Sequence, residues 1–266
     1  MRLVVVSDSH LSPSRPDGDR NWSTVVDHVE RLAPDLVVHG GDISADGVDD
    51  PDDLTHARHQ LDRLAVPWRA VPGNHDLGNP GDDPDLVEPR RRRYEEVFGP
   101  RFWSVERGGW RLVGLDSQAL EADHPDDEPS WRWTAEQLAG DLPIAVFQHR
   151  PLAPTAEGEF DTPKRYHTDP GRTRLRELLA GSPVRVVVSG HVHQWRDQAI
   201  GGIRFLWAPA TWARLPDAAQ PVIGTKVVGL VELDLGPGGG VEASVVSAGF
   251  EQAVVDEAAP RPPAYR

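Results

Sequence analysis

Cysteine is absent from this chain of 266 residues. Its absence excludes disulfides, thiolate zinc sites, iron–sulfur clusters and a cysteine nucleophile. Any metal site must therefore be built from histidine, aspartate, glutamate, asparagine and water. No apolar run is long enough to span a membrane, and the run after Met1 and Arg2 ends at Val6, which is too short for the core of a signal peptide. We therefore expect a cytoplasmic protein without a membrane partner.

Positive charge is also scarce. The chain has 28 basic and 42 acidic residues, which gives a formal net charge of −14. A protein this acidic repels polyanions, so nucleic acid is disfavoured as a partner. The composition is otherwise that of a globular protein, without internal repeats or a linker. We predict one domain over residues 1–250 followed by a flexible tail at 251–266, and a homodimer stays open.

Short apolar runs alternate with helical patterns along the chain. The runs are rich in valine and isoleucine, which suits strands buried on both faces, and the alternation predicts an α/β fold with a largely parallel sheet. The C-terminal runs at 203–207, 225–235 and 241–248 have no helix between them, so we expect an antiparallel set on a second sheet. The other predicted strands are 3–6, 36–38, 66–71, 111–115, 144–147 and 184–188, and the predicted helices are 22–32, 52–64, 90–98 and 172–179.

Histidine and acidic residues gather directly after the predicted strands. In an open α/β sheet, ligands bind at the carboxyl ends of the strands. Residues two apart in an extended segment point the same way, so Asp8 and His10 can face one ion, and His191 and His193 repeat that geometry. The five groups are Asp8-Ser9-His10, Gly40-Gly41-Asp42, Gly73-Asn74-His75-Asp76, Gln148-His149-Arg150 and Gly190-His191-Val192-His193.

The side chains in these groups offer carboxylate, imidazole and carboxamide ligands. This set suits manganese, iron, zinc or cobalt. Seven ligands are too many for one ion, whereas two ions that share a carboxylate fit the number. His75 is adjacent to Asn74 and must project differently, so we expect it over the substrate as a proton donor. We assign Asp8, His10 and His193 to the first ion, Asn74, His149 and His191 to the second, and Asp42 to a bridge between them.

In this order, the five groups resemble the signature of the calcineurin-like metallophosphoesterase superfamily. A single Gly-Asp or Gly-x-His is a weak signal, but five such elements in order, each after a predicted strand, are a strong one. The resemblance implies a four-layer α/β/β/α sandwich with two mixed sheets. It also implies a dinuclear metal site between the strand ends and the hydrolysis of phosphoesters.

The branch within the superfamily is indicated by what stands after the bridging aspartate. Protein phosphatases of this group have an arginine where this chain has Asp46, and purple acid phosphatases need a tyrosine where it has Ala45. The layout is most similar to bacterial class III cyclic-nucleotide phosphodiesterases and glycerophosphodiesterases. That group often has His-His-Pro, whereas this chain has Gln148-His149-Arg150-Pro151. Arg150 could either add positive charge near a phosphate or point away.

The resemblance therefore implies a phosphodiesterase that acts on cyclic nucleotides or glycerophosphodiesters. As a hypothesis, two divalent ions hold a bridging hydroxide that attacks phosphorus. Asn74 would contact the phosphate, His75 would protonate the leaving oxygen, and Asp76 would fix the tautomer of His75. A phosphomonoesterase and a DNA nuclease of the same superfamily stay open as alternatives. A non-catalytic scaffold is least favoured, because no ligand has been lost.

Other conspicuous residues admit less specific interpretations. We expect the basic run from Arg90 to Arg93 to form a solvated helix face that pairs with Glu95 and Glu96. His39 is expected to pack at a strand end. Of the nine tryptophans, Trp22, Trp195 and Trp212 lie near the motif loops and could stack on a base, whereas Trp103, Trp110, Trp131, Trp133 and Trp207 suit the core or an interface.

Overall fold

The first strand, β1 (Arg2–Val6), explains how the layers of the protein arise. Successive side chains of a strand point to opposite faces. In the computed structural model, Leu3 and Val5 enter one apolar core, whereas Val4 and Val6 enter another. A strand that is apolar on both faces must be covered on both faces, which requires a second sheet on one side and helices on the other.

The structure describes residues 1–121, 127–152 and 165–255, and within them two mixed sheets pack face to face. The first sheet has the order β11-β10-β1-β2-β3, and the second has the order β4-β5-β6-β7-β9-β8. Besides β1, the strands are β2 (Leu36–His39), β3 (Trp68–Ala70), β4 (Trp103–Arg107), β5 (Trp110–Leu115), β6 (Ile144–Gln148), β7 (Val184–Ser189), β8 (Arg196–Ile200), β9 (Ile203–Trp207), β10 (Leu230–Leu235) and β11 (Val241–Val246).

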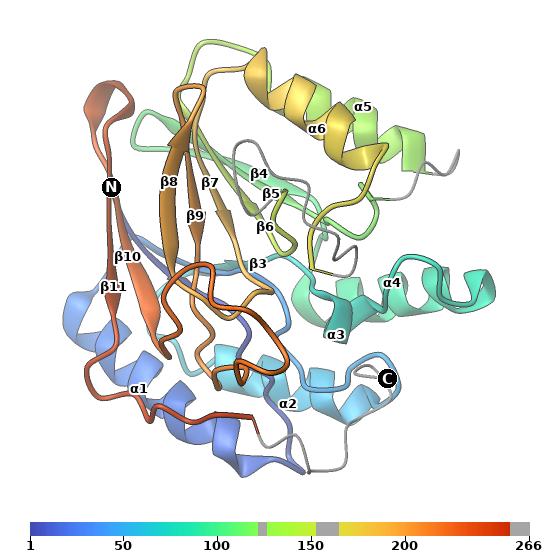
Figure 1. Ribbon diagram of the computed structural model, residues 1–266, viewed down its shortest axis with the longest axis vertical. Helices are drawn as coiled ribbons and strands as arrows, with labels where there is room; N and C mark the ends of the chain where they lie inside the picture. Colours follow the sequence, from blue (N-terminus) through green and yellow to red (C-terminus); the bar gives the residue numbers. More distant parts are fainter. Residues whose placement is uncertain (122–126, 153–164, 256–266) are drawn as a thin grey trace.

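Helices cover the outer face of each sheet (Figure 1). Trp22 and Val25 of α1 (Pro16–Leu32) and Leu54 of α2 (Pro51–Leu61) pack on the first sheet. Trp131 of α5 (Glu128–Gln137) and Leu175 of α6 (Gly171–Ala180) pack on the second. The short α3 (Asn74–Leu77) and α4 (Pro84–Phe98) follow β3. The four-layer α/β/β/α sandwich with two mixed sheets is therefore confirmed.

The C-terminal strands differ from the expected arrangement. They do not form one antiparallel set. β10 pairs antiparallel with β1 and β11 pairs antiparallel with β10 in the first sheet, whereas β9 pairs parallel with β7 in the second. β4 and β8 were not predicted, because both are edge strands with exposed polar positions and so lack a continuous apolar run. Pairing between distant strands is a tertiary property that local periodicity does not encode.

The C-terminal segment is attached to the body of the protein up to the end of the described residues. Glu251 donates its backbone N–H to Asn21 Oδ1 at 2.8 Å, and the backbone N–H of Val255 reaches the carbonyl of Arg214 at 2.9 Å. Residues 251 and 255 of the predicted tail are thus hydrogen-bonded to the rest of the protein, and 256–266 lie outside the described residues. Among the residues described, no helix has the length and apolar character needed to cross a membrane.

Candidate metal centre

Five loops meet where the carboxyl ends of strands from both sheets converge. β1, β2 and β3 bring Asp8, Asp42 and Asn74 from the first sheet, and β6 and β7 bring His149 and His191 from the second. Backbone hydrogen bonds connect these loops to one another. The N–H of residue 8 reaches the carbonyl of residue 41 at 3.0 Å, and that of residue 190 reaches the carbonyl of residue 149 at 2.9 Å. The motifs are thus neighbours in space, as their places after the strands predict.

The acidic and imidazole side chains form overlapping clusters around Asp42. His193 Nε2 lies 3.3 Å from Asp8 Oδ1, and His149 Nε2 lies 3.2 Å from Asp42 Oδ2. The His10 Nε2 atom is 3.9 Å from Asp42 Oδ2. Three sets of ligand atoms could each hold an ion, with the atoms of each set within 4.8 Å of one another. These sets are Asp8, His10 and His193; His10, Asp42 and His75; and Asp42, His149 and His191.

Backbone carbonyls fix the tautomers of two of these histidines. His149 Nδ1 lies 2.8 Å from the carbonyl of Gly40, and His193 Nδ1 lies 2.8 Å from that of Ala213. A carbonyl only accepts, so each Nδ1 must carry a proton, and in the neutral ring the lone pair is then on Nε2, which faces the cluster. Such an outer partner is what a metal-binding imidazole normally has.

Asn74 supplies an independent sign that these residues fit a cation. Its side chain is only 6% exposed, yet its Oδ1 atom has no hydrogen-bond partner. A buried carboxamide oxygen without a partner costs about 1–3 kcal/mol in unmade hydrogen bonding. A divalent cation would satisfy this oxygen, since carboxamide and carboxylate oxygens and imidazole nitrogens together suit transition metals.

The backbone of the ligand loops is strained in a consistent way. Five of the seven predicted ligands, Asp8, His10, Asp42, His191 and His193, have φ between 45° and 69°. This left-handed conformation costs non-glycine residues about 1–2 kcal/mol each, and it clusters at functional sites. The expectation that Asp8 and His10 face one ion because the segment is extended is therefore wrong in its reason. Both side chains reach one cluster through left-handed turns instead.

His75 enters the cluster from the first turn of α3. Its backbone N–H donates to Asp42 Oδ1 at 2.8 Å, and its Nδ1 lies 2.7 Å from the carbonyl of Ala45. Nδ1 therefore carries a proton, and Nε2 faces Asp42 Oδ2 at 3.9 Å. The ring thus points into the site, and the carbonyl of Ala45 fixes its tautomer. Our expectation that Asp76 does so is corrected by this contact.

Asp76 braces the loop that carries Asp42. Its carboxylate accepts hydrogen bonds from the backbone N–H groups of Ile43, Ser44 and Gly73 and from the hydroxyl of Ser44, at 2.7 to 3.2 Å. The carboxylate is fully buried, and burial, followed by the charge of Asp42, raises its pKa. These contacts make Asp76 a positioning residue that holds the Asp42 and Asn74 loops together.

His39 acts in the same way, although only packing was expected for it. Its Nδ1 accepts the N–H of Gly41 at 3.2 Å, and its Nε2 donates to the hydroxyl of Ser9 at 2.8 Å. The Ser9 hydroxyl in turn donates to the carbonyl of Ile43. Burial lowers the pKa of His39 to about 3, so the ring is neutral, as these two bonds require.

The electrostatics of the cluster favour a positive ion. Burial opposes charge on Asp42, but the imidazoles of His149 and His75 hold the pKa of its carboxyl well below the usual range. Burial likewise opposes charge on His149, but Asp42 outweighs it and raises the pKa of His149 to about 9. Burial and the neighbouring His75 keep the pKa of His10 well below its usual value. The Asp42 carboxylate is thus ionised and needs positive charge beside it.

Arg150 does not face the cluster but joins the loops behind it. Its guanidinium is 3% exposed and bonds to Glu121 at 2.8 Å and to Asn79 Oδ1 at 3.1 Å. Its backbone N–H donates to the Ser117 hydroxyl. The charge of Arg150 is therefore neutralised by Glu121. The side chain also connects the loop after His149 to the segment that follows α3.

The basic run in α4 and two of the three tryptophans near the motif loops also depart from expectation. Arg90 is 8% exposed and pairs with Asp82 and Asp49, and Arg91 pairs with Asp127, so these arginines reach surrounding loops rather than Glu95 and Glu96. Trp22 is fully buried and cannot stack on a ligand, and Trp195 packs against the core between the sheets. Trp212 does lie at the site, with its ring 4.8 Å from that of His10.

Some functional partners had no signal in the sequence. The carbonyls of Gly40, Ala45 and Ala213 orient three histidines, but every residue has a carbonyl, so only the fold selects these. Glu121 also lacked a motif. The pairing of Arg150 with an acid could have been guessed from its place after a buried strand, because a buried charge must be paired.

Comparisons with known proteins agree with this geometry. The family model for calcineurin-like phosphoesterases matches residues 1–195. The chain is 32% identical over 228 residues to the 3′,5′-cyclic adenosine monophosphate phosphodiesterase CpdA of Pseudomonas aeruginosa, covering 79% of this chain and 75% of that protein. It is 27% identical to the probable glycerophosphodiester phosphodiesterase GpdQ of Arcobacter nitrofigilis, with 73% and 72% covered. A dimetal phosphatase from Danio rerio has a similar fold, with a TM-score of 0.61, 16% identity and 93% and 98% covered.

Gly73 offers a test of the loop geometry. A Cβ atom there would lie 2.1 Å from Asp42 Oδ1 and 2.2 Å from Asp42 N, so Gly73→Ala must displace Asp42. We expect the affinity for Mn²⁺, measured by calorimetric titration, to fall by about 10–100-fold. Gly240→Ala is the control, since the nearest atoms there lie 4.0 Å away. Equal affinity in the two variants would contradict this geometry.

Arg150 offers a test of the buried pair. Burial raises the pKa of Glu121 to about 7 although Arg150 opposes the shift. Arg150→Gln leaves that carboxylate buried without its partner, which should lower the free energy of unfolding by about 3 kcal/mol at pH 8. The loss should be smaller at pH 6, because Glu121 of the folded variant then binds a proton that it does not bind in the unfolded chain. The stabilisation that this proton provides disappears as the pH rises.

Urea unfolding at the two pH values measures this effect. Arg2→Gln is the control, because Arg2 pairs with Asp234 on the surface and is 49% exposed. Its loss should cost less than about 1 kcal/mol at either pH. A loss for Arg150→Gln that equals the control, or that does not change with pH, would rule out a buried, charged pair.

Proposed function

Since the chain belongs to the calcineurin-like phosphoesterase family, we propose that it is a dinuclear metal-dependent phosphodiesterase that hydrolyses small diesters, either cyclic nucleotides or glycerophosphodiesters. The observation that carries the proposal is that six of the seven predicted ligands, together with His75, form overlapping clusters that could hold metal ions. Relatives named as cyclic-nucleotide and glycerophosphodiester phosphodiesterases support the substrate class. The lack of a membrane-spanning helix among the described residues is consistent with the cytoplasmic location that we propose.

Two divalent ions would be held by these overlapping clusters. The first would take Asp8, His10 and His193, and the second Asn74, His149 and His191, with Asp42 between them. Manganese, iron, zinc and cobalt all suit this donor set. When bound, such ions acidify water and neutralise charge on a phosphoryl group.

His75 is the residue of the chain that we propose as the proton donor. Its Nδ1 proton is engaged by the carbonyl of Ala45, so the proton that it transfers must leave from Nε2, which faces the cluster. The donor is therefore the imidazolium form, with a proton on each ring nitrogen. Asn74 would contact the phosphate next to His75. Asp76 would contribute by holding the loop on which both stand.

The positive charge near the phosphate has to come from the cluster itself. Arg150 is neutralised by Glu121, and an aspartate stands at position 46, where protein phosphatases of this superfamily have an arginine. A diester carries one negative charge, so it needs less compensation than a monoester. This arrangement therefore favours a phosphodiesterase over a phosphomonoesterase, and the acidic surface disfavours a DNA nuclease.

A substrate panel tests the proposal. Manganese-loaded protein should hydrolyse bis(p-nitrophenyl) phosphate faster than p-nitrophenyl phosphate, and it should turn over cyclic AMP, a 2′,3′-cyclic nucleotide or glycerophosphocholine. Asp42→Asn should lose metal by elemental analysis together with activity, whereas Asp46→Asn, in the same loop, should keep both. Turnover of the monoester alone would identify a phosphomonoesterase, and full metal content in Asp42→Asn would refute the bridging role.

The proton donor can be tested by varying the leaving group. His75→Ala should keep its metal content but lose about 10²-fold or more in kcat on cyclic AMP or glycerophosphocholine, whose leaving alkoxides need a proton. On bis(p-nitrophenyl) phosphate, whose leaving phenolate is stable, the loss should be much smaller. His56→Ala, which removes a surface imidazole paired with Asp19, is the control. An equal loss on good and poor leaving groups would remove His75 from this role.

A further inference from the structure

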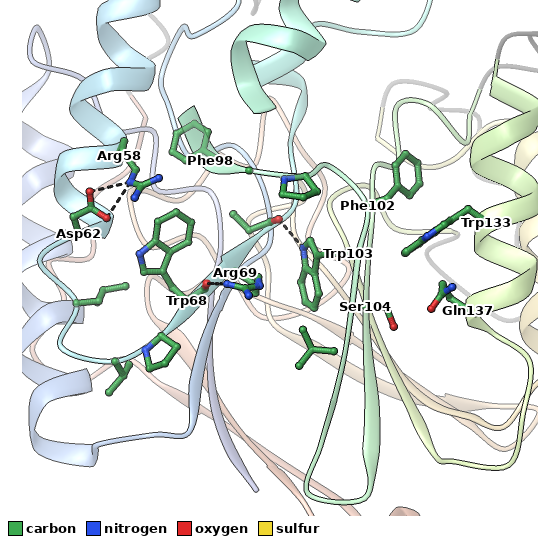
Figure 2. Close-up of a pocket in the computed structure, with 17 residues that line it drawn as sticks. Arg58, Asp62, Trp68, Arg69, Phe98, Phe102, Trp103, Ser104, Trp133 and Gln137 are labelled. Atoms are coloured by element: carbon green, nitrogen blue, oxygen red, sulfur yellow. Dashed lines mark hydrogen bonds and ion pairs between the residues drawn. The ribbon is translucent and has the colours of Figure 1, made fainter. Parts of the chain in front are cut away.

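A second cleft, separate from the candidate metal centre, opens between the edges of the two sheets. It has a volume of about 810 Å³ and lies between β3, at the edge of the first sheet, and β4, at the edge of the second. None of the seven predicted ligands lines it. This volume falls within the range of pockets that hold small ligands, about 300–1,000 Å³. Figure 2 shows the side chains that line it.

The walls of the cleft are aromatic. Trp68, Phe102 and Trp133 are half-buried, which leaves part of each ring at the surface of the cleft. The guanidinium of Arg58 lies over the ring of Trp68, 4.9 Å from its centre, and is held by Asp62. Planar rings of this kind favour a ligand that has a flat apolar part, since such a ligand can stack on them.

Several acceptors around the cleft are already used. The carbonyl of Ala70 accepts from the indole of Trp103, and that of Trp68 accepts from the side chain of Arg69. The carbonyl of Gln137 is likewise bonded to Arg111, and the carboxylate of Asp62 is paired with Arg58. These acceptors are therefore less available to a ligand that brings donors.

Donors, in contrast, remain available. In a parallel ladder only alternate residues of an edge strand bond to the neighbouring strand. Pro67 O and Val71 N bond to β2, so the main-chain groups of Trp68 and Ala70 turn toward the open edge. Arg69 is exposed, and its Nη1 bonds to a carbonyl rather than a carboxylate. In Figure 2, Arg69 lies between Trp68 and Trp103. Its charge is therefore available to an anion.

This combination selects one class of ligand. A peptide strand added to β3 would need both donors and acceptors from the edge, and the Trp103 indole blocks one of those acceptors. A cation would have to compete with Arg58 for the ring of Trp68. We propose that this cleft is a second binding site, and that it takes a planar aromatic anion of the nucleoside monophosphate class, with the ring against the aromatic walls of the cleft and the phosphate on Arg69.

Binding to the metal-free protein tests this proposal without involving the candidate metal centre. After removal of metal with EDTA and dialysis, titration with 5′-AMP should give one site by calorimetry. Adenosine lacks the phosphate and ribose 5-phosphate lacks the ring, so each should bind at least about tenfold more weakly than AMP. No heat of binding with AMP, or equal binding of ribose 5-phosphate, would overturn the proposal.

Variants assign the binding to the cleft. Arg69→Gln should weaken AMP binding about tenfold, the loss expected for one charge-assisted hydrogen bond. Trp68→Leu should weaken it as well, provided that its thermal unfolding midpoint shows a folded protein. Arg132→Gln is the matched control, because it removes the same charge from an exposed residue that does not line the cleft. Equal affinity in Arg69→Gln and Arg132→Gln would refute the site, whatever activity the metal-loaded protein has.

Discussion

The arrangement of the site depends on two buried carboxylates, Asp8 and Asp42. Each is almost fully buried at a point where two sheets meet, and an isolated carboxylate in that position would be prohibitively costly. The protein compensates with imidazoles at 3.2 to 3.9 Å, and those imidazoles are themselves buried. Such a cluster is stable only when every member has a fixed partner, and its converging ligand atoms could hold a metal ion.

The loops that carry these residues are built to hold them, even at some cost. Five of the ligand positions adopt left-handed backbone conformations, which the surrounding hydrogen bonds must maintain. Asp76 and His39 supply many of those bonds by clamping the Asp42 loop from two sides. Carbonyls behind the imidazoles complete the arrangement, because each one sets which nitrogen faces the cluster. The geometry of the site thus depends on residues that would never touch a substrate.

The arginines of this protein differ in what they can bind according to where they lie. The chain is strongly acidic, and its buried arginines form ion pairs within the protein. Arg150 pairs with Glu121, and Arg90 pairs with Asp82 and Asp49. An arginine that pairs internally orders loops but attracts no ligand. Arg69 differs because it stands beside an open cleft and bonds to a carbonyl rather than to a carboxylate. A buried, paired arginine therefore orders the loops around it, whereas an arginine at the cleft can attract a ligand.

The sequence by itself determined the layers and the ligand groups. Apolar runs such as Leu3 to Val6 are covered on both faces wherever they occur, and polar groups after such strands must meet at the sheet edge. Only the tertiary structure decided how β9, β10 and β11 divide between the sheets, which carbonyl orients His75, and that Arg150 meets Glu121. The physical reason is range: periodicity and turn chemistry act between neighbours along the chain. Strand pairing, carbonyl partners and buried ion pairs instead join residues that only the completed fold brings within a few ångströms.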